Sequence, residues 1–552
     1  MKYVILGGVA AGTKAAAKLK RLDRLAEVLI FTKSADISYA GCGLPYYIGG
    51  DIASREELIV NSPEKYAGLT GAKVQIGCEA IGVECERKEV TIRRTDGSVF
   101  AETYDKLIIA TGAAPFVPPV DGVGLAGAFC VRTPDDAVAI REYAEINKCH
   151  RAVVCGAGFI GLEVAENLAA LNMEVVVIDA APQIMPNAFD EDMAGYAKRQ
   201  LKASGMRVLT SVSLKGINGK DHVESVDTDS GVLQADIVIL AIGVRPATAF
   251  LNDSGIEMFK GTVIVDENMR TNIPDIYAVG DCAMVKNAIT DRPQRSAMGS
   301  TANLAARAMA KRMYDQGAGY GGCLGTGVVR LLPTLNGGRT GLTQEQAAAA
   351  GIEATSVVCV LDDKAHYYPG ASSFIFKLTA DTASRRILWI QVLGAGAVDK
   401  MVDIAVTGIY NGMKLDEFDT MDFAYAPPFS TAIHPFVTSC YILENKLDGV
   451  IDRMSPSEYA SGAAKEYTVL DALPAPSIPN ARWIELPKVV EPVEGLDKDA
   501  KLLLVCAKGK RGYFLQNRLK ALGYTNTRVL EGGITFNEVR VPRGGKKLSP
   551  EE

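Results

Sequence analysis

Two cysteines stand in sequence settings where a thiol could do chemistry. Cys42 lies between two glycines in the run Ser38-Tyr-Ala-Gly-Cys-Gly-Leu-Pro-Tyr-Tyr47. No second cysteine follows within five residues, so this thiol has no close neighbour with which to form an internal disulfide. A lone redox thiol must instead cycle through a mixed disulfide, a persulfide or a sulfenic acid. The alternative is a buried, inert cysteine, which the flanking glycines disfavour.

The second cysteine, Cys506, opens the loop Cys506-Ala-Lys-Gly-Lys-Arg511. The loop follows an apolar strand expected over 501–505 and precedes a helix expected to reach about residue 522. Backbone N–H groups and the helix dipole can stabilise a thiolate or persulfide anion at such a position. The side chains expected to add positive charge are those of Lys508, Lys510 and Arg511.

Two glycine-rich turns, each after an apolar strand and before a helix, indicate dinucleotide binding. In the second turn, Gly156 permits the tight turn, Gly158 lets the backbone reach a pyrophosphate, and Gly161 lets the helix pack close to the strand. Ile160 belongs to the same expected contact. Asp179 ends the following strand, where a carboxylate accepts a hydrogen bond from a ribose 2′-OH and repels a 2′-phosphate. The sequence therefore predicts NADH over NADPH, unless Asp179 is an ordinary turn residue.

The first glycine turn departs from the ideal pattern. Val9 occupies the usual place of the second glycine, and Thr32 stands where an acidic ribose ligand is expected. A bound dinucleotide is still expected, with its adenosine end held by Thr32 and backbone or bound less tightly. The predicted contacts of this site are Gly7, Gly8, Ala11, Gly12, Thr32 and Lys33.

Composition narrows the class of protein. The 552 residues carry a net charge of −6 with mixed signs, which argues against nucleic acid as a partner. The 11 cysteines are scattered and form no CxxC pair, so neither a disulfide framework nor a metal site is expected. The N-terminus runs directly into a strand and does not read as a signal peptide, and no apolar run is long enough to span a membrane. A cytoplasmic protein is expected.

Four motifs together resemble one family. They are Gly-Gly-x-Ala-Ala-Gly, Ser-Tyr-x-x-Cys-Gly-Leu-Pro-Tyr-Tyr, Ala-Thr-Gly-Ala-x-Pro and Ile-Tyr-Ala-Val-Gly-Asp-Cys. They are similar to those of the single-cysteine flavoprotein pyridine nucleotide–disulfide oxidoreductases, and most of all to the coenzyme A-disulfide and coenzyme A-persulfide reductases. The resemblance covers about residues 1–445. It implies FAD in the first nucleotide site, NAD(P)H in the second, and a homodimer formed through the third domain.

The resemblance also implies roles for individual residues. Asp281 would hold the flavin ribitol, Thr111 and Gly112 would line the crossover beside the flavin ring, and Glu163 would lie near the flavin–nicotinamide contact. Each has a plainer alternative as a turn residue or, for Glu163, a carboxylate complementing a helix dipole. Tyr367 and Tyr425, which in the family project from the partner subunit, would donate a hydrogen bond or a proton to sulfur; the alternatives are buried packing and, for the first, Tyr368.

Coenzyme A needs cations for its phosphates. Lys18 and Arg21 lie three positions apart on the first expected helix, and Arg307 matches a family position for the same task. The alternative for each is a solvated helix face. Gly41 replaces an asparagine often found before the cysteine, so one substrate contact is expected to be missing. The other predicted substrate contacts are Ser38, Tyr39 and Asn303.

The loop at Cys506 resembles the active loop of a rhodanese domain. Asp471 fits the domain's Asp-Val-Arg element, but Ala472 and Leu473 follow it, and Ser477–Pro479 replaces the usual Gly-His-Ile. The module is therefore expected either to handle sulfane sulfur, to bind its donor weakly, or only to dock.

The predicted fold class is α/β, with two Rossmann-like nucleotide-binding domains, an α+β dimerisation domain and a small C-terminal α/β rhodanese-like domain. The expected boundaries are 1–148 and 250–322 for FAD, 149–249 for NAD(H), 323–445 for dimerisation, 446–465 for a linker, and 466–552 for the rhodanese-like domain.

The function predicted from these features is NAD(P)H-driven reduction of coenzyme A persulfide, polysulfide or disulfide at Cys42, with sulfane sulfur handled at Cys506. One alternative is an NADH oxidase or peroxidase on the same scaffold, although the peroxidases' histidine is absent from the first glycine turn, where Val9-Ala10-Ala11 stands. A second alternative is a redox-sensing flavoprotein with negligible turnover.

Overall fold

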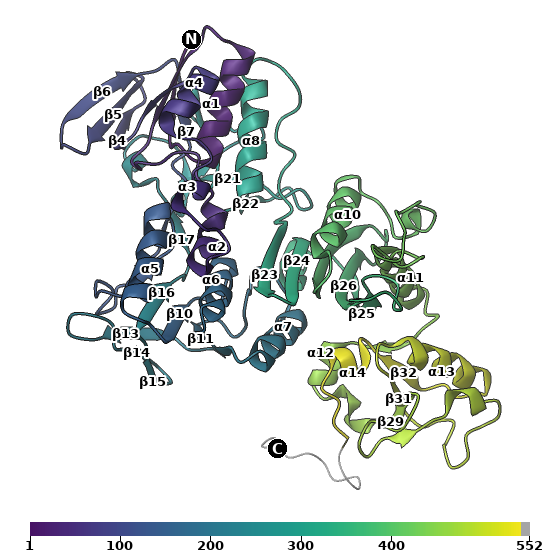
Figure 1. The fold of residues 1–552 in the computed structure, drawn as a ribbon. Helices are drawn as coiled ribbons and strands as arrows, with labels where there is room; N and C mark the ends of the chain where they lie inside the picture. Colours follow the sequence, from purple (N-terminus) through teal and green to yellow (C-terminus); the bar gives the residue numbers. More distant parts are fainter. Residues whose placement is uncertain (542–552) are drawn as a thin grey trace. The chain divides into compact units, whose positions relative to one another are not determined.

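The computed structural model describes residues 1–541 of the chain, which falls into two compact units (Figure 1). The first unit comprises Met1–Pro186 and Leu201–Gly325. The second comprises Asn187–Gln200 and, among the described residues, the chain from 326 to 541. Residues 542–552, which the sequence assigns to the C-terminal domain, lie outside the described residues.

A five-stranded parallel sheet forms the core of the first domain. In sheet order its strands are β20 (Ile276–Ala278), β7 (Lys106–Ile109), β1 (Lys2–Leu6), β2 (Glu27–Phe31) and β3 (Lys73–Gln75). Because strand side chains alternate, Tyr3 and Ile5 pack against helices α1 (Ala10–Leu22) and α8 (Gly299–Arg312). Val4 and Leu6 face the antiparallel sheet formed by β4 (Cys78–Glu84), β5 (Glu89–Arg94) and β6 (Val99–Thr103).

The second domain repeats the parallel plan. In sheet order its strands are β12 (Arg207–Thr210), β11 (Glu174–Asp179), β10 (Arg151–Cys155), β16 (Ile237–Leu240) and β9 (Ala128–Cys130). Helix α6 (Phe159–Ala170) connects β10 to β11, as α1 connects β1 to β2. Because all these strands are parallel, each sheet gathers its glycine turn and the neighbouring strand ends at one edge, which is where α/β sheets bind ligands.

An antiparallel sheet forms the core of the third domain, in the second unit. Its order is β23 (Gly327–Leu332), β24 (Leu335–Gly341), β27 (Ile387–Gly394), β26 (Ser373–Asp381) and β25 (Ala354–Asp362). Helices α10 (Val398–Tyr410) and α11 (Pro435–Leu447) share a hydrophobic core with it. The segment Asn187–Gln200, which the sequence assigns to the range 149–249, packs here instead, because Lys377 on β26 pairs with Asp190 at 3.0 Å and Asp192 at 2.9 Å.

The C-terminal domain has a third all-parallel sheet, ordered β28 (Arg453–Met454), β32 (Thr527–Leu530), β31 (Leu502–Val505), β29 (Thr468–Asp471) and β30 (Arg482–Trp483). Helix α13 (Lys510–Ala521) packs on it. The structure differs from the expected linker over 446–465, because β28 is a strand of this sheet and α12 (Pro456–Ala460) follows it. The polar and proline residues that suggest a linker are the Ser455 cap and the Pro456 first position of α12.

The architecture confirms the predicted α/β class, with two Rossmann-like domains followed by an α+β domain and a small α/β domain. Within residues 1–541, no helix combines the length and the apolar composition that a membrane crossing requires.

Candidate active site

Cys42 is presented at the start of a short helix. It lies in a 3₁₀ turn, Gly41–Gly43, that continues into α2 (Leu44–Gly49). Its neighbours Leu44 and Pro45 are buried, whereas Cys42 itself is exposed. The chain therefore anchors the helix and leaves the thiol accessible.

Helix α2 packs on α6, and this contact brings Glu163 beside the thiol. A Cβ on Gly49 would lie 2.1 Å from Oδ1 of Asn167, so only glycine fits there. Asn167 is fixed in turn by donating from Nδ2 to the Glu163 carbonyl at 2.8 Å. Tyr46, four residues after Cys42, donates from its hydroxyl to Oε1 of Glu163 at 3.1 Å. The glutamate is thus held by the helix that directly follows the turn carrying the cysteine.

The charges around Cys42 oppose its ionisation. Although the residue is exposed, desolvation by the surrounding protein raises the pKa of the thiol, and the negative charges of Glu163 and Asp281 raise it further. Arg132 is the group that lowers it. Nη1 of Arg132 lies 3.9 Å from Oδ2 of Asp281, and Nη2 would lie 3.0 Å from a Cβ on Gly112. Sequence reasoning missed Arg132, because no motif marks the stretch between β9 and the next helix.

The two glycine turns have the same geometry. Gly7 and Gly156 adopt φ of +116° and +109°. A Cβ on Gly12 would lie 1.9 Å from the Gly7 carbonyl oxygen, and one on Gly161 would lie 1.9 Å from that of Gly156. Across the described residues of both helix starts, no acidic residue lies in the first turn and no side chain caps the N-terminus. Both turns therefore leave backbone N–H groups for phosphate.

In the second turn, space is open for a ligand. A Cβ on Gly158 would meet nothing within 4 Å, and Ile160 is 44% exposed. The Asp179 carboxylate accepts from the N–H of Ala157 at 2.7 Å and from that of Ala181 at 2.8 Å. It therefore braces the glycine turn from the ribose end of the expected site.

In the first turn, Thr32 is buried and its side chain would lie 3.2 Å from a Cβ on Gly8. Lys33 is exposed and pairs with Glu79 instead. Ala11 is buried, and its Cβ would lie 3.1 Å from one on Gly280. The strand end before Asp281 thus meets the N-terminus of α1.

The residues predicted to contact the flavin have a chemistry that suits a bound flavin. Oγ1 of Thr111 is buried without a hydrogen-bond partner among the described residues. Burial raises the pKa of Asp281, with Arg132 and Arg295 opposing. Gly112 adopts φ of +68°, which turns the chain directly after Thr111. A polar cofactor edge would satisfy Thr111 and Asp281, since buried polar groups are normally hydrogen-bonded.

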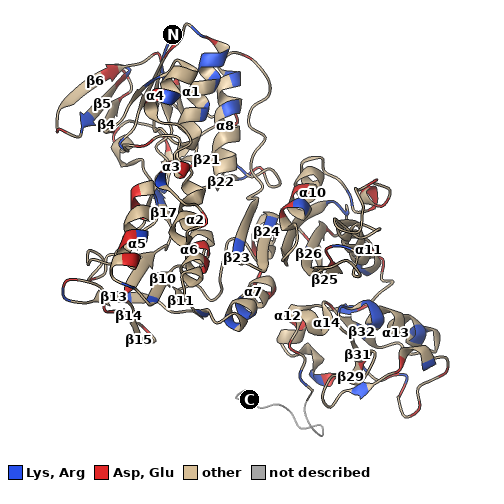
Figure 2. Cartoon of the chain, in the orientation of Figure 1, with Lys and Arg blue, Asp and Glu red and all other residues tan. Residues whose placement is uncertain are grey.

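Four cations gather on the packed helices α1 and α8. Burial lowers the pKa of Lys18, and the charges of Arg307, Lys311 and Arg21 lower it further. Figure 2 shows basic positions on both helices. Lys311 is an addition to the predicted set, and its spacing of four from Arg307 was the available signal.

Two of the other predicted substrate contacts, Asn303 and Ser38, have side-chain partners within the chain. Asn303 donates from Nδ2 to the Gly299 carbonyl at 2.8 Å. The Ser38 hydroxyl accepts from Asn61 at 3.3 Å. Burial raises the pKa of the Tyr39 phenol.

Tyr367 and Tyr425 lie together on the surface of the second unit. They are 66% and 48% exposed. A hydrogen bond with Tyr367 is the largest cause that raises the pKa of Tyr425. The two tyrosines thus interact with each other within one chain.

Cys506 is 2% exposed and is the most buried of the predicted catalytic groups. Its Sγ accepts from the N–H of Gly509 at 3.1 Å and of Gly512 at 3.4 Å. The pair Gly532-Gly533 closes over this loop, because a Cβ on Gly533 would lie 2.1 Å from the Cys506 carbonyl oxygen. This glycine pair after an apolar strand is a signal that sequence reasoning passed over.

The cations expected at Cys506 are largely engaged elsewhere. Nζ of Lys508 donates to Oδ1 of Asp362 at 2.5 Å and to the Ser373 hydroxyl at 2.8 Å, on β25 and β26. Nε of Arg511 donates to the Ala472 carbonyl at 2.6 Å, and Lys510 is exposed. The reason is that the loop is docked on the third domain, which supplies Asp362.

We expect Glu163→Gln to lower the apparent pKa of Cys42. The variant removes a negative charge that raises this pKa but keeps an oxygen for Tyr46. Alkylation of Cys42 at neutral pH, followed by peptide mass spectrometry in the reduced, FAD-loaded protein, should become roughly twofold to fivefold faster. Glu142→Gln is the matched control, because Glu142 is exposed on helix α5 (Pro134–Ile146). An unchanged pH profile in Glu163→Gln would contradict the electrostatic role.

Comparison with known proteins agrees with this geometry. The sequence-family model of the pyridine nucleotide-disulphide oxidoreductases matches residues 1–308. The family model of their dimerisation domain matches residues 333–436, and the family model of the rhodanese-like domain matches residues 442–535.

Three similar proteins illustrate the range of the family. A protein named NADH oxidase from Methanocaldococcus jannaschii is 34% identical over 79% of this chain and 97% of its own. A CoA-dependent NAD(P)H sulfur oxidoreductase from Pyrococcus abyssi is 34% identical over 80% of this chain and 98% of its own. The structure of a NAD-dependent persulfide reductase from A. fulgidus is 31% identical, covers 97% of this chain and 100% of its own, and has a TM-score of 0.92. The chain therefore belongs to the pyridine nucleotide-disulphide oxidoreductases, enzymes that use FAD and NAD(P)H, and it also carries a rhodanese-like domain.

Proposed function

We propose that this enzyme reduces persulfides, polysulfides or disulfides of coenzyme A with NAD(P)H at Cys42. The observation that carries the proposal is a single exposed thiol, without a second cysteine nearby in the sequence, on the same unit as a cluster of four cations. The names of the sulfur oxidoreductase and the persulfide reductase support it.

The reaction at Cys42 follows from thiol chemistry. Its thiolate attacks the coenzyme A-bound sulfur of the persulfide, so that a disulfide forms between Cys42 and coenzyme A while the substrate's S–S bond breaks and hydrosulfide leaves. Two electrons that originate from NAD(P)H then cleave this mixed disulfide and regenerate both thiolates. With coenzyme A disulfide as substrate, the first leaving group is the coenzyme A thiolate.

The residues of the first unit have distinct tasks. Gly7, Gly12 and the α1 N-terminus would hold the pyrophosphate of FAD, and Asp281 and Thr111 would bind its polar groups; the bound flavin supplies electron transfer between nicotinamide and sulfur. Glu163 and Tyr46 orient the segment that carries Cys42. Lys18, Arg21, Arg307 and Lys311 would bind the phosphates of coenzyme A.

The second unit would contribute the partner. The match to the dimerisation domain supports a homodimer, in which the exposed Tyr367 and Tyr425 would approach the partner's thiol and supply a hydrogen bond or a proton. Cys506 would receive or deliver sulfane sulfur. All 11 cysteines are unpaired, which favours a reducing compartment such as the cytoplasm.

The test is anaerobic NADH oxidation with coenzyme A persulfide, coenzyme A disulfide and glutathione persulfide in parallel. We expect Cys42→Ser to abolish turnover. Lys18→Met and Arg307→Met should raise KM for the coenzyme A substrates roughly tenfold, because each removes a charged hydrogen-bond donor, while leaving glutathione persulfide unaffected. Arg24→Met, at an exposed position after α1, is the control. Full persulfide reduction by Cys42→Ser would refute the central role of that thiol.

An NADH oxidase is the second candidate, because a relative at 34% identity carries that name. The same assay separates the two. No turnover with any sulfur substrate, but rapid NADH loss once air is admitted, would assign the protein to oxygen reduction. No NADH consumption under either condition would favour a redox sensor.

We also expect a preference for NADH over NADPH. The Asp179 carboxylate stands at the strand end beside the second glycine turn, where it would repel a 2′-phosphate. Comparing kcat/KM for both nucleotides measures this preference, and Asp179→Asn, which keeps an acceptor oxygen for Ala157, should narrow it by about tenfold. Equal kcat/KM values in the unmodified enzyme would contradict the assignment.

A further inference from the structure

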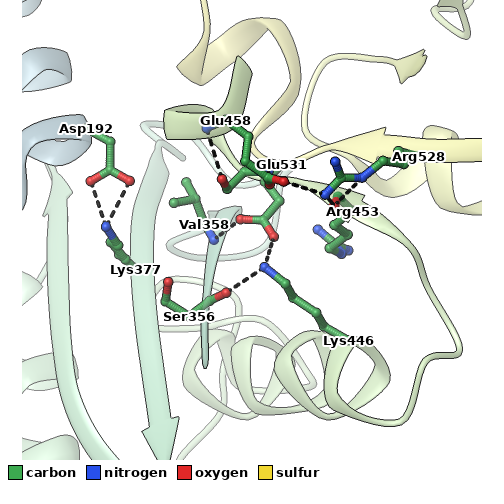
Figure 3. Close-up of polar contacts among 10 residues, drawn as sticks. Asp192, Ser356, Val358, Lys377, Lys446, Arg453, Glu458, Arg528 and Glu531 are labelled. Atoms are coloured by element: carbon green, nitrogen blue, oxygen red, sulfur yellow. Dashed lines mark hydrogen bonds and ion pairs between the residues drawn. The ribbon is translucent and has the colours of Figure 1, made fainter. Parts of the chain in front are cut away.

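Arg453 is a buried cation whose side chain is not fully hydrogen-bonded within residues 1–541. It lies on β28, is 9% exposed, and its Nε has no hydrogen-bond partner among the described residues. In Figure 3 its backbone carbonyl accepts from Arg528, whereas no dashed line reaches its guanidinium. A buried charge that is left unpaired destabilises a fold, so its presence requires an explanation.

The acidic groups near Arg453 are satisfied by other residues. Oε1 of Glu531 accepts from Lys446 at 2.7 Å, and its Oε2 accepts from the N–H of Val358 at 2.9 Å. Glu458 accepts from Arg528 at 2.8 Å and from the Ser455 N–H at 2.8 Å. Figure 3 shows both carboxylates with these bonds made. In Figure 3 neither of these two carboxylates is drawn with a bond to the Arg453 guanidinium.

The guanidinium lies next to the Cys506 loop, and its charge also opposes the rise in pKa that burial causes at Cys359 on β25. Nη1 of Arg453 lies 4.0 Å from the position that a Cβ on Gly509 would take. Gly509 is the N-cap of α13, a helix of 12 residues, and its N–H donates to Sγ of Cys506. Arg453 therefore lies beside the residue whose N–H bonds to the Cys506 sulfur.

The other cations of the loop form hydrogen bonds to other groups of the domain or of its neighbour. Lys508 bonds to Asp362 and Ser373, and Arg511 bonds through Nε to the Ala472 carbonyl. Lys508 is therefore neutralised by a carboxylate, and the α13 N-terminus and Arg453 add positive charge near Cys506 to that of Arg511.

We propose that Arg453 and the N-terminus of α13 form an anion site that holds the terminal sulfur of a persulfide on Cys506. This inference rests on the proposed handling of sulfane sulfur by Cys506. With thiosulfate as donor, the Cys506 thiolate attacks the outer sulfur, the new S–S bond forms as the donor's S–S bond breaks, and sulfite leaves. The negative charge then resides on the terminal sulfur, next to Arg453.

The experiment uses the full-length, FAD-loaded protein. It is incubated with thiosulfate or, separately, glutathione persulfide, the excess is removed, and sulfane sulfur on the Cys506 peptide is followed over time by mass spectrometry. Arg453→Met should shorten the lifetime of the persulfide about tenfold, because a charged hydrogen-bond donor is lost. Arg453→Lys should retain most of it. Arg540→Met, at an exposed position in the same domain, should match the unmodified protein.

Thermal unfolding separates binding from a structural role. Removal of an unpaired buried charge should leave Tm of Arg453→Met equal to or above that of the unmodified protein. A Tm that falls with Arg453→Met and returns with Arg453→Lys would show that the residue holds the domain together, and would overturn the proposal. An unchanged persulfide lifetime in a stable Arg453→Met would overturn it too.

A failure of the proposed function is distinguishable from a failure of this inference. If the unmodified protein acquires no sulfur on Cys506, sulfur handling there is wrong. Arg453 is then judged by alkylation of Cys506 as a function of pH. A profile displaced to higher pH in Arg453→Met, but not in Arg540→Met, supports an anion site at the thiolate, and coincident profiles exclude one.

Discussion

The contact between α2 and α6 is the constraint on which the first unit's chemistry depends. Gly49 has no space for a Cβ against Asn167, and Asn167 in turn bonds to the backbone of Glu163. A redox thiol in one Rossmann-like domain must act on electrons that arrive from a nucleotide bound to the other. One close helix–helix approach, which only glycine permits, therefore sets the position of the thiol relative to the second glycine turn.

The parts of this molecule that were predictable are those encoded locally. The glycine turns follow from short-range sterics, because the third glycine must clear the carbonyl of the first within a single turn of chain. The class of fold follows from the strand–turn–helix pattern repeated around these turns. By contrast, Arg132 reaches the active site only through the tertiary approach of its loop to Asp281 and Gly112. The residues next to Arg132 in the sequence do not indicate this position at the active site.

The same distinction explains where the sequence-based account fails in the second unit. The segment 446–465 is polar and contains proline, but its residues serve a strand and a helix cap whose partners are distant in sequence. Lys508 has the residue type and the sequence spacing of an anion ligand. In the folded second unit, however, it bonds to the Asp362 carboxylate on β25. Charged side chains are long, so their partners depend on packing more than on the local motif.

The electrostatics of the two cysteines point to a division of labour. Around Cys42, burial and the carboxylates of Glu163 and Asp281 raise the pKa of the thiol, and the charge of Arg132 opposes them. Around Cys506, two N–H groups point at sulfur, and Arg453, whose Nε is unpaired among the described residues, lies beside the N-terminus of the helix that follows. Elsewhere in the second unit the buried cation Lys377 is neutralised by two aspartates, which is the usual solution for a buried charge. Among the described residues, no carboxylate forms an ion pair with Arg453. A negatively charged sulfur on Cys506 would provide this missing countercharge.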